Sequence, residues 1–240
     1  MKFSIKDNNF SLDDKKVFLN SGEIHYFRIR RELWDKHLDE AVSAGLHAVS
    51  TYVPWAWHEE KEGVFDFDGT SCPEKDLNGW LRKCKEHGLH AIVKPGPFIL
   101  AEFRGAGLPD WFLERYGYDV RMRTRQGVRV ISDGVSLFNK DYLYKVRLWY
   151  DQIMPIIRSN ELHLGGPVIM MQVCNEIGVF SWLARQADYG NEVRNRFISW
   201  ASEKYGTVNE LNNQWGTSYN AFDEIELPPD GREPYVSPAD

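Results

Sequence analysis

The sequence predicts an α/β fold in which parallel strands alternate with helices. The segment Gly-Leu-His-Ala-Val-Ser at 45–50 returns as Gly-Leu-His-Ala-Ile-Val at 88–93. Each copy is typical of a helix end followed by a short apolar strand, and further strand and helix patterns follow in the same order. Alternation of this kind builds a parallel sheet with helices outside it, as in a doubly wound sheet or an eightfold barrel.

The helices are predicted from apolar residues that recur three and four positions apart, the period of one helix face. The first stripe runs from Trp34 to Gly45, and the second follows Asp76, a suitable N-cap residue. Gly45 and Gly88 fit the left-handed position that commonly follows the last helical turn. The predicted helices begin near Trp34, Leu77, Asp141 and Asn191, and the last two extend to Ile157 and Tyr205.

Short apolar segments between these helices predict the strands. Proline ends two of them, because it cannot donate a hydrogen bond to a sheet ladder. The glycine turn that opens a helix in dinucleotide-binding sheets is missing, since Gly105-Ala106-Gly107 runs directly into Leu108-Pro109. The four strands are predicted over 24–27, 48–53, 91–93 and 168–173.

The composition narrows the classes of function. The chain has 29 Lys plus Arg against 35 Asp plus Glu, a formal charge of -6, which argues against binding to nucleic acid or an anionic membrane. Its apolar stretches fall short of the about 20 residues that span a bilayer, and residues 1–19 lack a signal-peptide core. Three scattered cysteines fit neither a disulfide framework nor a metal site. We therefore expect a cytoplasmic protein without a metal or other cofactor.

Aromatic and acidic residues follow the predicted strands, where parallel α/β folds place their sites. These residues include Arg28, Tyr52, Trp55, Trp57, His58, Glu59, Phe98, Ala101, Glu102, Phe103, Asn175 and Glu176. Aromatic faces suit the apolar side of a sugar ring, and carboxylates bind its hydroxyls. We therefore expect a carbohydrate substrate.

Glu176 is the predicted acid for cleaving a glycosidic bond. This reaction needs a carboxylic acid that protonates the leaving oxygen and a second carboxylate across the anomeric carbon. Glu176 directly follows an apolar strand, whose neighbours would desolvate it and favour its protonated form, and Asn175 could hold a substrate hydroxyl. An inverting reaction that paired Glu176 with Glu102 would need carboxyl groups about 6.5 to 9.5 Å apart.

Several segments combine into a family pattern. They are Gly22-Glu23-Ile24-His25-Tyr26, Thr51-Tyr52-Val53-Pro54-Trp55-Ala56-Trp57-His58-Glu59, Pro95-Gly96-Pro97-Phe98-Ile99-Leu100-Ala101-Glu102, Gly107-Leu108-Pro109 and Asn175-Glu176. In order and spacing they resemble the β-galactosidases of glycoside hydrolase family 35. Residues 205–217 and 223–225 resemble the related family 42 β-galactosidases. Both families share a (β/α)8 TIM barrel and a retaining double displacement, so the resemblance implies that this chain holds about the first four strand-helix units of such a barrel.

The resemblance also assigns roles to individual residues. It makes Glu176 the general acid and base. It places Tyr52, Ile99, Ala101, Glu102 and Asn175 around a terminal galactose. Leu100, Phe103 and Cys174 stand where family members usually have cysteine, tryptophan and glutamate, and these departures concern the sugar contacts more than the reaction class.

The nucleophile is expected beyond Asp240, because in the family it ends the seventh strand of the barrel. We therefore predict a β-galactosidase-type hydrolase whose 240-residue chain hydrolyses little by itself. The alternative is a non-catalytic sugar-binding module or an inactive fragment of such an enzyme.

The whole chain is predicted to be the amino-terminal part of one catalytic barrel, with a proline-rich connecting loop over 223–240. Trp55 and Trp57 are candidates for a sugar-stacking platform, with a position in the core as the alternative. Four tryptophans on helix stripes are expected in the core, namely Trp34, Trp80, Trp149 and Trp200. A half barrel would leave an apolar sheet edge unpaired.

Overall fold

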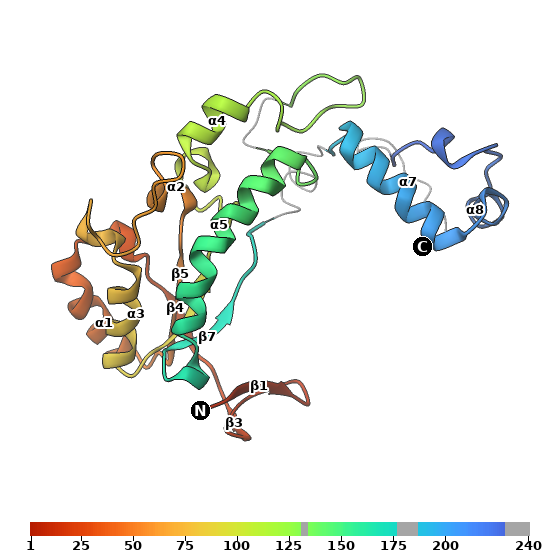
Figure 1. The fold of residues 1–240 in the computed structure, drawn as a ribbon. Helices are drawn as coiled ribbons and strands as arrows, with labels where there is room; N and C mark the ends of the chain where they lie inside the picture. The colour runs from red at the N-terminus through yellow and green to blue at the C-terminus, as the bar shows by residue number, and fades with distance from the viewer. Residues whose placement is uncertain (131–133, 177–186, 229–240) are drawn as a thin grey trace. The chain divides into compact units, whose positions relative to one another are not determined.

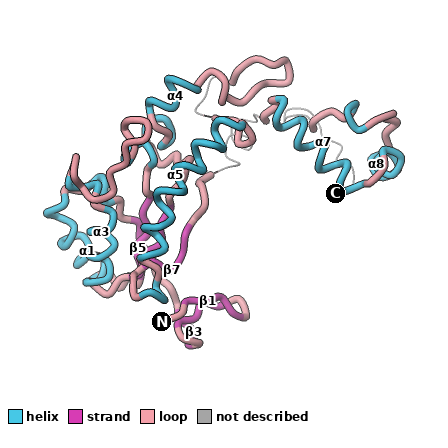
Figure 2. Tube along the Cα trace, viewed as in Figure 1, coloured by secondary structure: helices cyan, strands magenta, loops and turns pink. Residues whose placement is uncertain are grey.

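The computed structural model describes residues 1–130, 134–176 and 187–228, which fall into two compact units. The first unit comprises residues 1–114 and 146–176, and the second comprises 115–145 with the described residues from 187 onward. Figure 1 labels most of the helices and strands, and Figure 2 distinguishes helices from strands by colour. All six predicted site residues belong to the first unit.

A parallel sheet forms the centre of the first unit. Its strands are β4 (Ser21–Glu23), β5 (Ala48–Tyr52), β6 (His90–Lys94) and β7 (Val168–Met171), hydrogen-bonded in the order β4-β5-β6-β7. The register sets Glu23 beside Ser50 and Tyr52 beside Lys94. The carboxyl ends of these strands therefore meet at one edge of the sheet, as the alternating sequence pattern predicts.

The predicted helices are present. They are α1 (Trp34–Ser43), α3 (Leu77–Glu86), α5 (Lys140–Ser159) and α7 (Asn191–Tyr205), with shorter helices α2 (Trp55–His58), α4 (Asp110–Tyr116) and α8 (Val208–Trp215). Asp76 caps α3 by accepting a hydrogen bond from Gly79 N at 2.7 Å. Gly45 and Gly88 have φ values of 78° and 72°, the predicted left-handed conformation after a helix. Figure 1 shows α1 and α3 side by side, and α3 contacts β6.

All four strands differ from their predicted bounds, β5 and β6 by no more than one residue at an end and β4 and β7 by more. The first strand was expected over 24–27 but ends at Glu23, because the chain then turns through the 3-10 helix Tyr26–Arg28 and buries the Tyr26 ring. Ile24 N still donates to Ser50 O at 3.0 Å. The last strand was expected to reach Val173 but ends at Met171, and Val173 is 62% exposed.

The aromatic core confirms most of the predicted buried tryptophans. Trp34, Trp80 and Trp149 are each at most 1% exposed. The prediction for Trp200 is wrong, because it is 45% exposed on α7, where the buried residues are instead Ala201 and Tyr205. Amphipathic spacing alone did not identify which side of α7 faces the core.

An amino-terminal antiparallel sheet was not predicted. Its strands are β1 (Phe3–Lys6), β2 (Asn9–Leu12) and β3 (Lys15–Val17). The two turns between them are Asp7-Asn8 and Asp13-Asp14, and all four residues have positive φ values. Asp and Asn favour such hairpin turns, so a short-range signal was available in the sequence.

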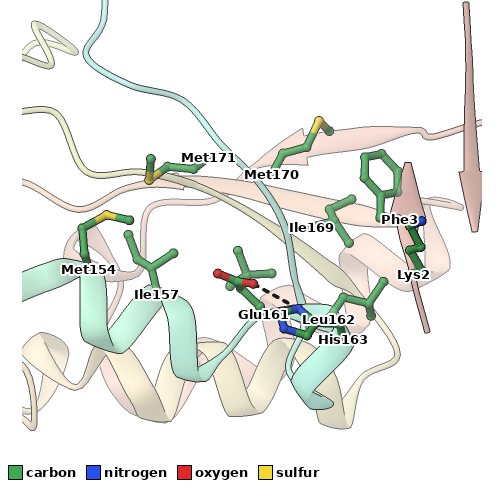
Figure 3. Close-up of a pocket in the computed structure, with 11 residues that line it drawn as sticks. Lys2, Phe3, Met154, Ile157, Glu161, Leu162, His163, Ile169, Met170 and Met171 are labelled. Atoms are coloured by element: carbon green, nitrogen blue, oxygen red, sulfur yellow. Dashed lines mark ion pairs between the residues drawn. The ribbon is translucent and has the colours of Figure 1, made fainter. Parts of the chain in front are cut away.

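An apolar hollow of about 530 Å³ lies beside β7 (Figure 3). Among the described strands, β7 pairs only with β6, so β7 and β4 form the edges of the parallel sheet. Figure 3 shows Met154, Ile157, Met170 and Met171 around this hollow, with Phe3 of β1 near Ile169. The hollow is therefore lined mainly by apolar side chains, together with Lys2, Glu161 and His163.

The carboxy-terminal part is only partly described. Phe222–Glu224 is a 3-10 helix and residues 225–228 have no regular structure, while 229–240 of the predicted connecting loop lie outside the described residues. Within the part of the chain that the structure describes, no helix is both long and apolar enough to cross a membrane.

Candidate active site

A network of charged and polar side chains joins the ends of β4, β5 and β6. The Glu23 carboxylate pairs with the Lys94 ammonium and accepts a hydrogen bond from Ser50 Oγ at 3.0 Å. Its other oxygen lies 3.1 Å from Nε2 of His25. The Lys94 Nζ lies 3.9 Å from the centroid of the Tyr52 ring. Three neighbouring strand ends are thereby held in one arrangement.

The network sets the charge of its members. Burial acts to raise the pKa of Glu23, but the hydrogen bonds from Lys94 and Ser50 outweigh burial and lower this pKa below its ordinary value. Burial lowers the pKa of His25, although the Glu23 carboxylate acts in the opposite direction. At neutral pH the network therefore holds an ionised Glu23 and a neutral His25.

Tyr52 connects this network to the predicted site. The residue is 7% exposed and its ring packs 5.4 Å from that of His25. Burial raises the pKa of the Tyr52 phenol, and the carboxylates of Glu23, Glu176 and Glu102 raise it further. Glu102 and Glu176 therefore lie within electrostatic reach of the same phenol, as a common site requires.

The loop after β6 presents Ile99, Ala101 and Glu102. Leu100, Ala101 and Glu102 have φ values of 56°, 48° and 48°, a conformation that residues with a Cβ rarely adopt in succession. The carbonyl oxygen of Ala101 accepts a hydrogen bond from the Arg28 guanidinium at 2.6 Å. Ile99 is fully buried beneath the loop. Strained backbone of this kind is typical of functional sites, where surrounding contacts hold it in place.

The segment after β7 is attached to that loop by hydrogen bonds. Asn175 Nδ2 donates to the carbonyl oxygen of Ile99 at 2.8 Å, and Asn175 Oδ1 accepts from Gln172 Nε2 at 2.8 Å. Cys174 N donates to Gly96 O at 2.8 Å. The bonds from Asn175 Nδ2 and from Cys174 N both join the segment after β7 to the segment after β6. Each Asn175 amide atom is already used by the protein, which leaves one N–H and one lone pair for a substrate hydroxyl.

Glu176 is exposed, and the prediction that its strand desolvates it is wrong. The strand ends at Met171, so the residues that follow carry Glu176 away from the apolar sheet. Glu176 has a φ of 49°, a left-handed conformation that Cys174 also adopts. In the described chain its side chain reaches solvent at the same edge as Tyr52 and Glu102.

Trp55 is not a sugar platform, because its side chain is fully buried. Its indole N–H donates to the carboxylate of Glu59, which is 4% exposed and also accepts from Gly63 N at 2.7 Å. The Trp55 ring stacks on Trp149, with centroids 6.2 Å apart. Trp55 and Glu59 therefore support the loop after β5 from within the core. Trp57 is partly exposed, and its role as a platform stays a prediction.

Sequence reasoning missed Lys94. A lysine that ends an otherwise apolar strand was the available signal, since burial of a cation requires a partner. Glu23 supplies that partner. Among the described residues, no group of three or more His, Cys, Asp or Glu is arranged to hold a metal ion.

Solved structures identify the class of fold as the barrel of the β-galactosidases. The chain is similar to the β-galactosidase of Halorubrum lacusprofundi, with a TM-score of 0.66 and 19% identity over 90% of this chain and 30% of that one. It is also similar to the Marinomonas ef1 β-galactosidase, with a TM-score of 0.65 and 21% identity over 92% of this chain and 31% of that one. The parallel sheet and its helices are therefore part of a TIM barrel.

The family follows from the sequence. The family model described as "Glycosyl hydrolases family 35" matches residues 9–226, and the chain belongs to this family. This confirms the resemblance to family 35, while the likeness of the carboxy-terminal stretch to family 42 stays a prediction.

The names of three curated relatives state three different activities on sugars. The Beta-1,2-glucosyltransferase of Ignavibacterium album is 41% identical over 95% of this chain and 32% of its own length. The Exo-beta-D-glucosaminidase of Pyrococcus horikoshii is 32% identical over 98% of this chain and 31% of its own length. The Beta-galactosidase of Mus musculus is 35% identical over 82% of this chain and 27% of its own length. The chain thus spans about a third or less of the relatives it matches.

Proposed function

We propose that this chain is the acid-base half of a β-galactosidase-type glycoside hydrolase, with Glu176 as the general acid and base. The observation that carries the proposal is the hydrogen bond from Asn175 to Ile99 O, which joins the segment of Glu176 to the loop of Glu102. The proposal is also supported by the carboxylates of Glu102 and Glu176, which both raise the pKa of the Tyr52 phenol.

The proposed reaction is a retaining double displacement. Glu176 gives its proton to the departing glycosidic oxygen, and a second carboxylate attacks the anomeric carbon to form a glycosyl-enzyme. Glu176, now ionised, then takes a proton from the water that releases the sugar. The exposed position of Glu176 permits both steps, since the leaving group and the water must reach it.

The second carboxylate is assigned to a residue beyond Asp240. The two carboxyl groups of a retaining enzyme lie about 5 to 5.5 Å apart. Relatives about three times longer than this chain supply the room for such a residue. Glu102 is assigned to sugar binding with Tyr52, Ile99, Ala101 and Asn175.

The test compares the 240-residue chain with the longest product of the same gene on a chromogenic β-galactoside. The proposal expects turnover by the long product and little by the short chain. Robust turnover by the short chain would refute the assignment of the nucleophile. Nuclear magnetic resonance of the first-formed sugar anomer then separates a retaining reaction from an inverting one that pairs Glu102 with Glu176.

A second candidate is the transfer or hydrolysis of a β-glucoside. It is favoured by the 41% identity to a relative named Beta-1,2-glucosyltransferase. Aryl β-galactoside, β-glucoside and β-glucosaminide are compared at equal concentration, with and without glucose as an acceptor. Preference for the glucoside, with a disaccharide product only when glucose is present, would select this candidate.

A third candidate is a non-catalytic sugar-binding module. It is favoured by a site that holds Glu102 and Glu176 without an assigned nucleophile within the described residues. Binding of galactose to the long product without any hydrolysis of the three aryl glycosides would select it.

A further inference from the structure

A polar hollow of about 430 Å³ lies within the second unit, apart from the proposed active-site residues. It is bordered by the loop of residues 119–130 and 134–136, by the start of α5, and by the start of α7. Its volume falls within the about 300 to 1,000 Å³ that small-molecule sites occupy.

The walls of the hollow are held by hydrogen bonds from backbone N–H groups. Asp188 Oδ1 accepts from Arg123 N at 3.0 Å and from Gly190 N at 2.9 Å. Tyr189 N donates to Arg123 O at 2.8 Å, so the loop and the start of α7 form one framework. The hollow is therefore preorganised by the chain itself, which reduces the entropic cost of binding.

Ser136 is one of the residues that line this hollow. The residue is 4% exposed, and its backbone N donates to Val120 O at 2.7 Å. Among the described residues, Ser136 Oγ has no hydrogen-bond partner although it is buried. Buried hydroxyls in native proteins are nearly always paired, so this one indicates a ligand or an ordered water.

The start of α7 adds backbone donors on another side. Gly190 is the N-cap of this 15-residue helix and gives its first turn no side-chain hydrogen bond. The first N–H groups of an α-helix have no partner within the helix, and they bind oxygen acceptors.

The charges around the hollow are balanced. Its cationic residues are Arg121, Arg123 and Lys140, and its acidic residues are Asp119, Asp141 and Glu192. An anion would be attracted by one set and repelled by the other. A neutral molecule with many hydroxyls can donate to the carboxylates while it accepts from the guanidinium, serine and helix N–H groups. Balanced charge and mixed hydrogen bonding therefore favour a sugar over a phosphate or an apolar ligand.

We propose that this hollow is a carbohydrate-binding site for one or two sugar rings, with Ser136 Oγ and the first turn of α7 as its central contacts. The inference concerns binding alone and does not require Glu176 to be catalytic.

The test is a titration of the isotope-labelled 240-residue chain with lactose, followed by amide chemical shifts. The proposal expects saturable shifts at Ser136, at 139–141 and at 190–192. No shift in these amides, or shifts confined to residues 52, 99–102 and 175–176, would overturn it. Shifts in the hollow without shifts at those site residues would instead count against the proposed function and leave this site standing.

A parallel titration uses inorganic phosphate alone. The proposal expects weaker binding of phosphate than of lactose at these amides, because the carboxylates of Asp119, Asp141 and Glu192 oppose an anion. Saturable shifts with phosphate but none with lactose would overturn the assignment to carbohydrate.

The variant Ser136→Ala tests the central contact. It should weaken lactose binding at the hollow by about three- to tenfold, the effect of one lost hydrogen bond. Its melting temperature without ligand should be unchanged or higher, because a buried unpaired hydroxyl is removed. Ser199→Ala, at an exposed position of the same unit, is the matched control and should bind as the unmodified chain. Unchanged lactose binding by S136A would overturn the proposal. If S136A fails to fold, Glu192→Gln is tested in its place, with an expected loss of lactose binding of the same size.

Discussion

The two halves of the proposed site are held in different ways. At the ends of β4, β5 and β6, the partly exposed Glu23 and Ser50 interlock with the buried Lys94 and Tyr52. After β7, the chain runs through residues 172–176 outside any strand, and hydrogen bonds of Asn175 and Cys174 attach it to the loop after β6.

The difference shows where rigidity and access are needed. The interlocked half presents Tyr52 on a fixed base, which suits recognition of a sugar ring. The other half presents Glu176 at the surface, which suits proton exchange with a leaving group and with water. The following predictions test this division, from the largest expected effect to the smallest.

The largest effect is expected for Glu176→Gln in the longest product of the gene. Loss of the general acid should reduce kcat on lactose by about 100- to 10,000-fold. Stability should be unchanged, because the Glu176 side chain is exposed. Steady-state kinetics and thermal unfolding measure the two quantities.

Glu102→Gln is the control for this variant, since Glu102 is assigned to sugar binding. Its effect should fall mainly on KM. A loss of kcat by E102Q as large as that of E176Q would erase the distinction between the two carboxylates.

His58 is buried at the end of α2, which follows β5, and we expect it to make the stability of the chain depend on pH. Its Nδ1–H donates to Asp66 O, and Nε2 accepts from the Tyr26 hydroxyl, so the ring is neutral. Burial lowers the pKa of His58 from 6.5 to about 4. The unfolded chain therefore binds the proton first, and stability should fall by about 3 kcal/mol as the pH drops from 6.5 towards 4.

Urea unfolding of the 240-residue chain at pH 7 and pH 4.5 measures this dependence. His58→Gln should be less stable at pH 7 and should show a smaller fall between the two pH values. An equal fall in both proteins would show that His58 is not responsible.

Lys94→Met should destabilise the chain by about 1 to 2 kcal/mol, because it leaves Glu23 without its cation. This loss of stability is smaller than for a fully buried ion pair, because the Glu23 side chain is 41% exposed. The loss should shrink at low pH, where Glu23 becomes protonated. Urea unfolding measures it.

Lys83→Met is the matched control, because Lys83 also pairs with an acidic residue, Asp35, but its side chain is more exposed, at 33% against 8% for Lys94. It should have no measurable effect. Equal losses for K83M and K94M would indicate that the network at the strand ends is no stronger than a surface ion pair.

A smaller effect is expected for Asn175→Ala, which removes the hydrogen bonds to Ile99 O and from Gln172. Stability should fall by about 1 kcal/mol, and KM should rise more than kcat falls. Asn78→Ala, which removes an exposed amide pair with Asn160, is the control. An unchanged KM in N175A would show that this segment does not shape the sugar subsite.

The sequence predicted the repeating units of the fold because their signals are local. The stripes before Gly45 and Gly88, the cap at Asp76 and the apolar strands all depend on neighbouring residues. Trp200 shows the limit, since the buried face of α7 carries Ala201 and Tyr205 and packs against Leu211 and Ile225, which lie further along the chain.

The candidate site was predicted from linked motifs and strand-end positions, and the structure brings these residues to one edge. The contacts that position them were not predictable, because they join residues far apart in sequence. Lys94 pairs with Glu23 across two strands, and the exposure of Glu176 depends on where β7 ends.

The most direct test of the acid role of Glu176 compares two leaving groups in the longest product of the gene. A poor leaving group, such as the glucose of lactose, needs protonation, whereas an activated phenol departs without it. E176Q should therefore lose much more kcat/KM on lactose than on the aryl β-galactoside. Equal losses on both substrates would contradict the assignment of Glu176 as the proton donor.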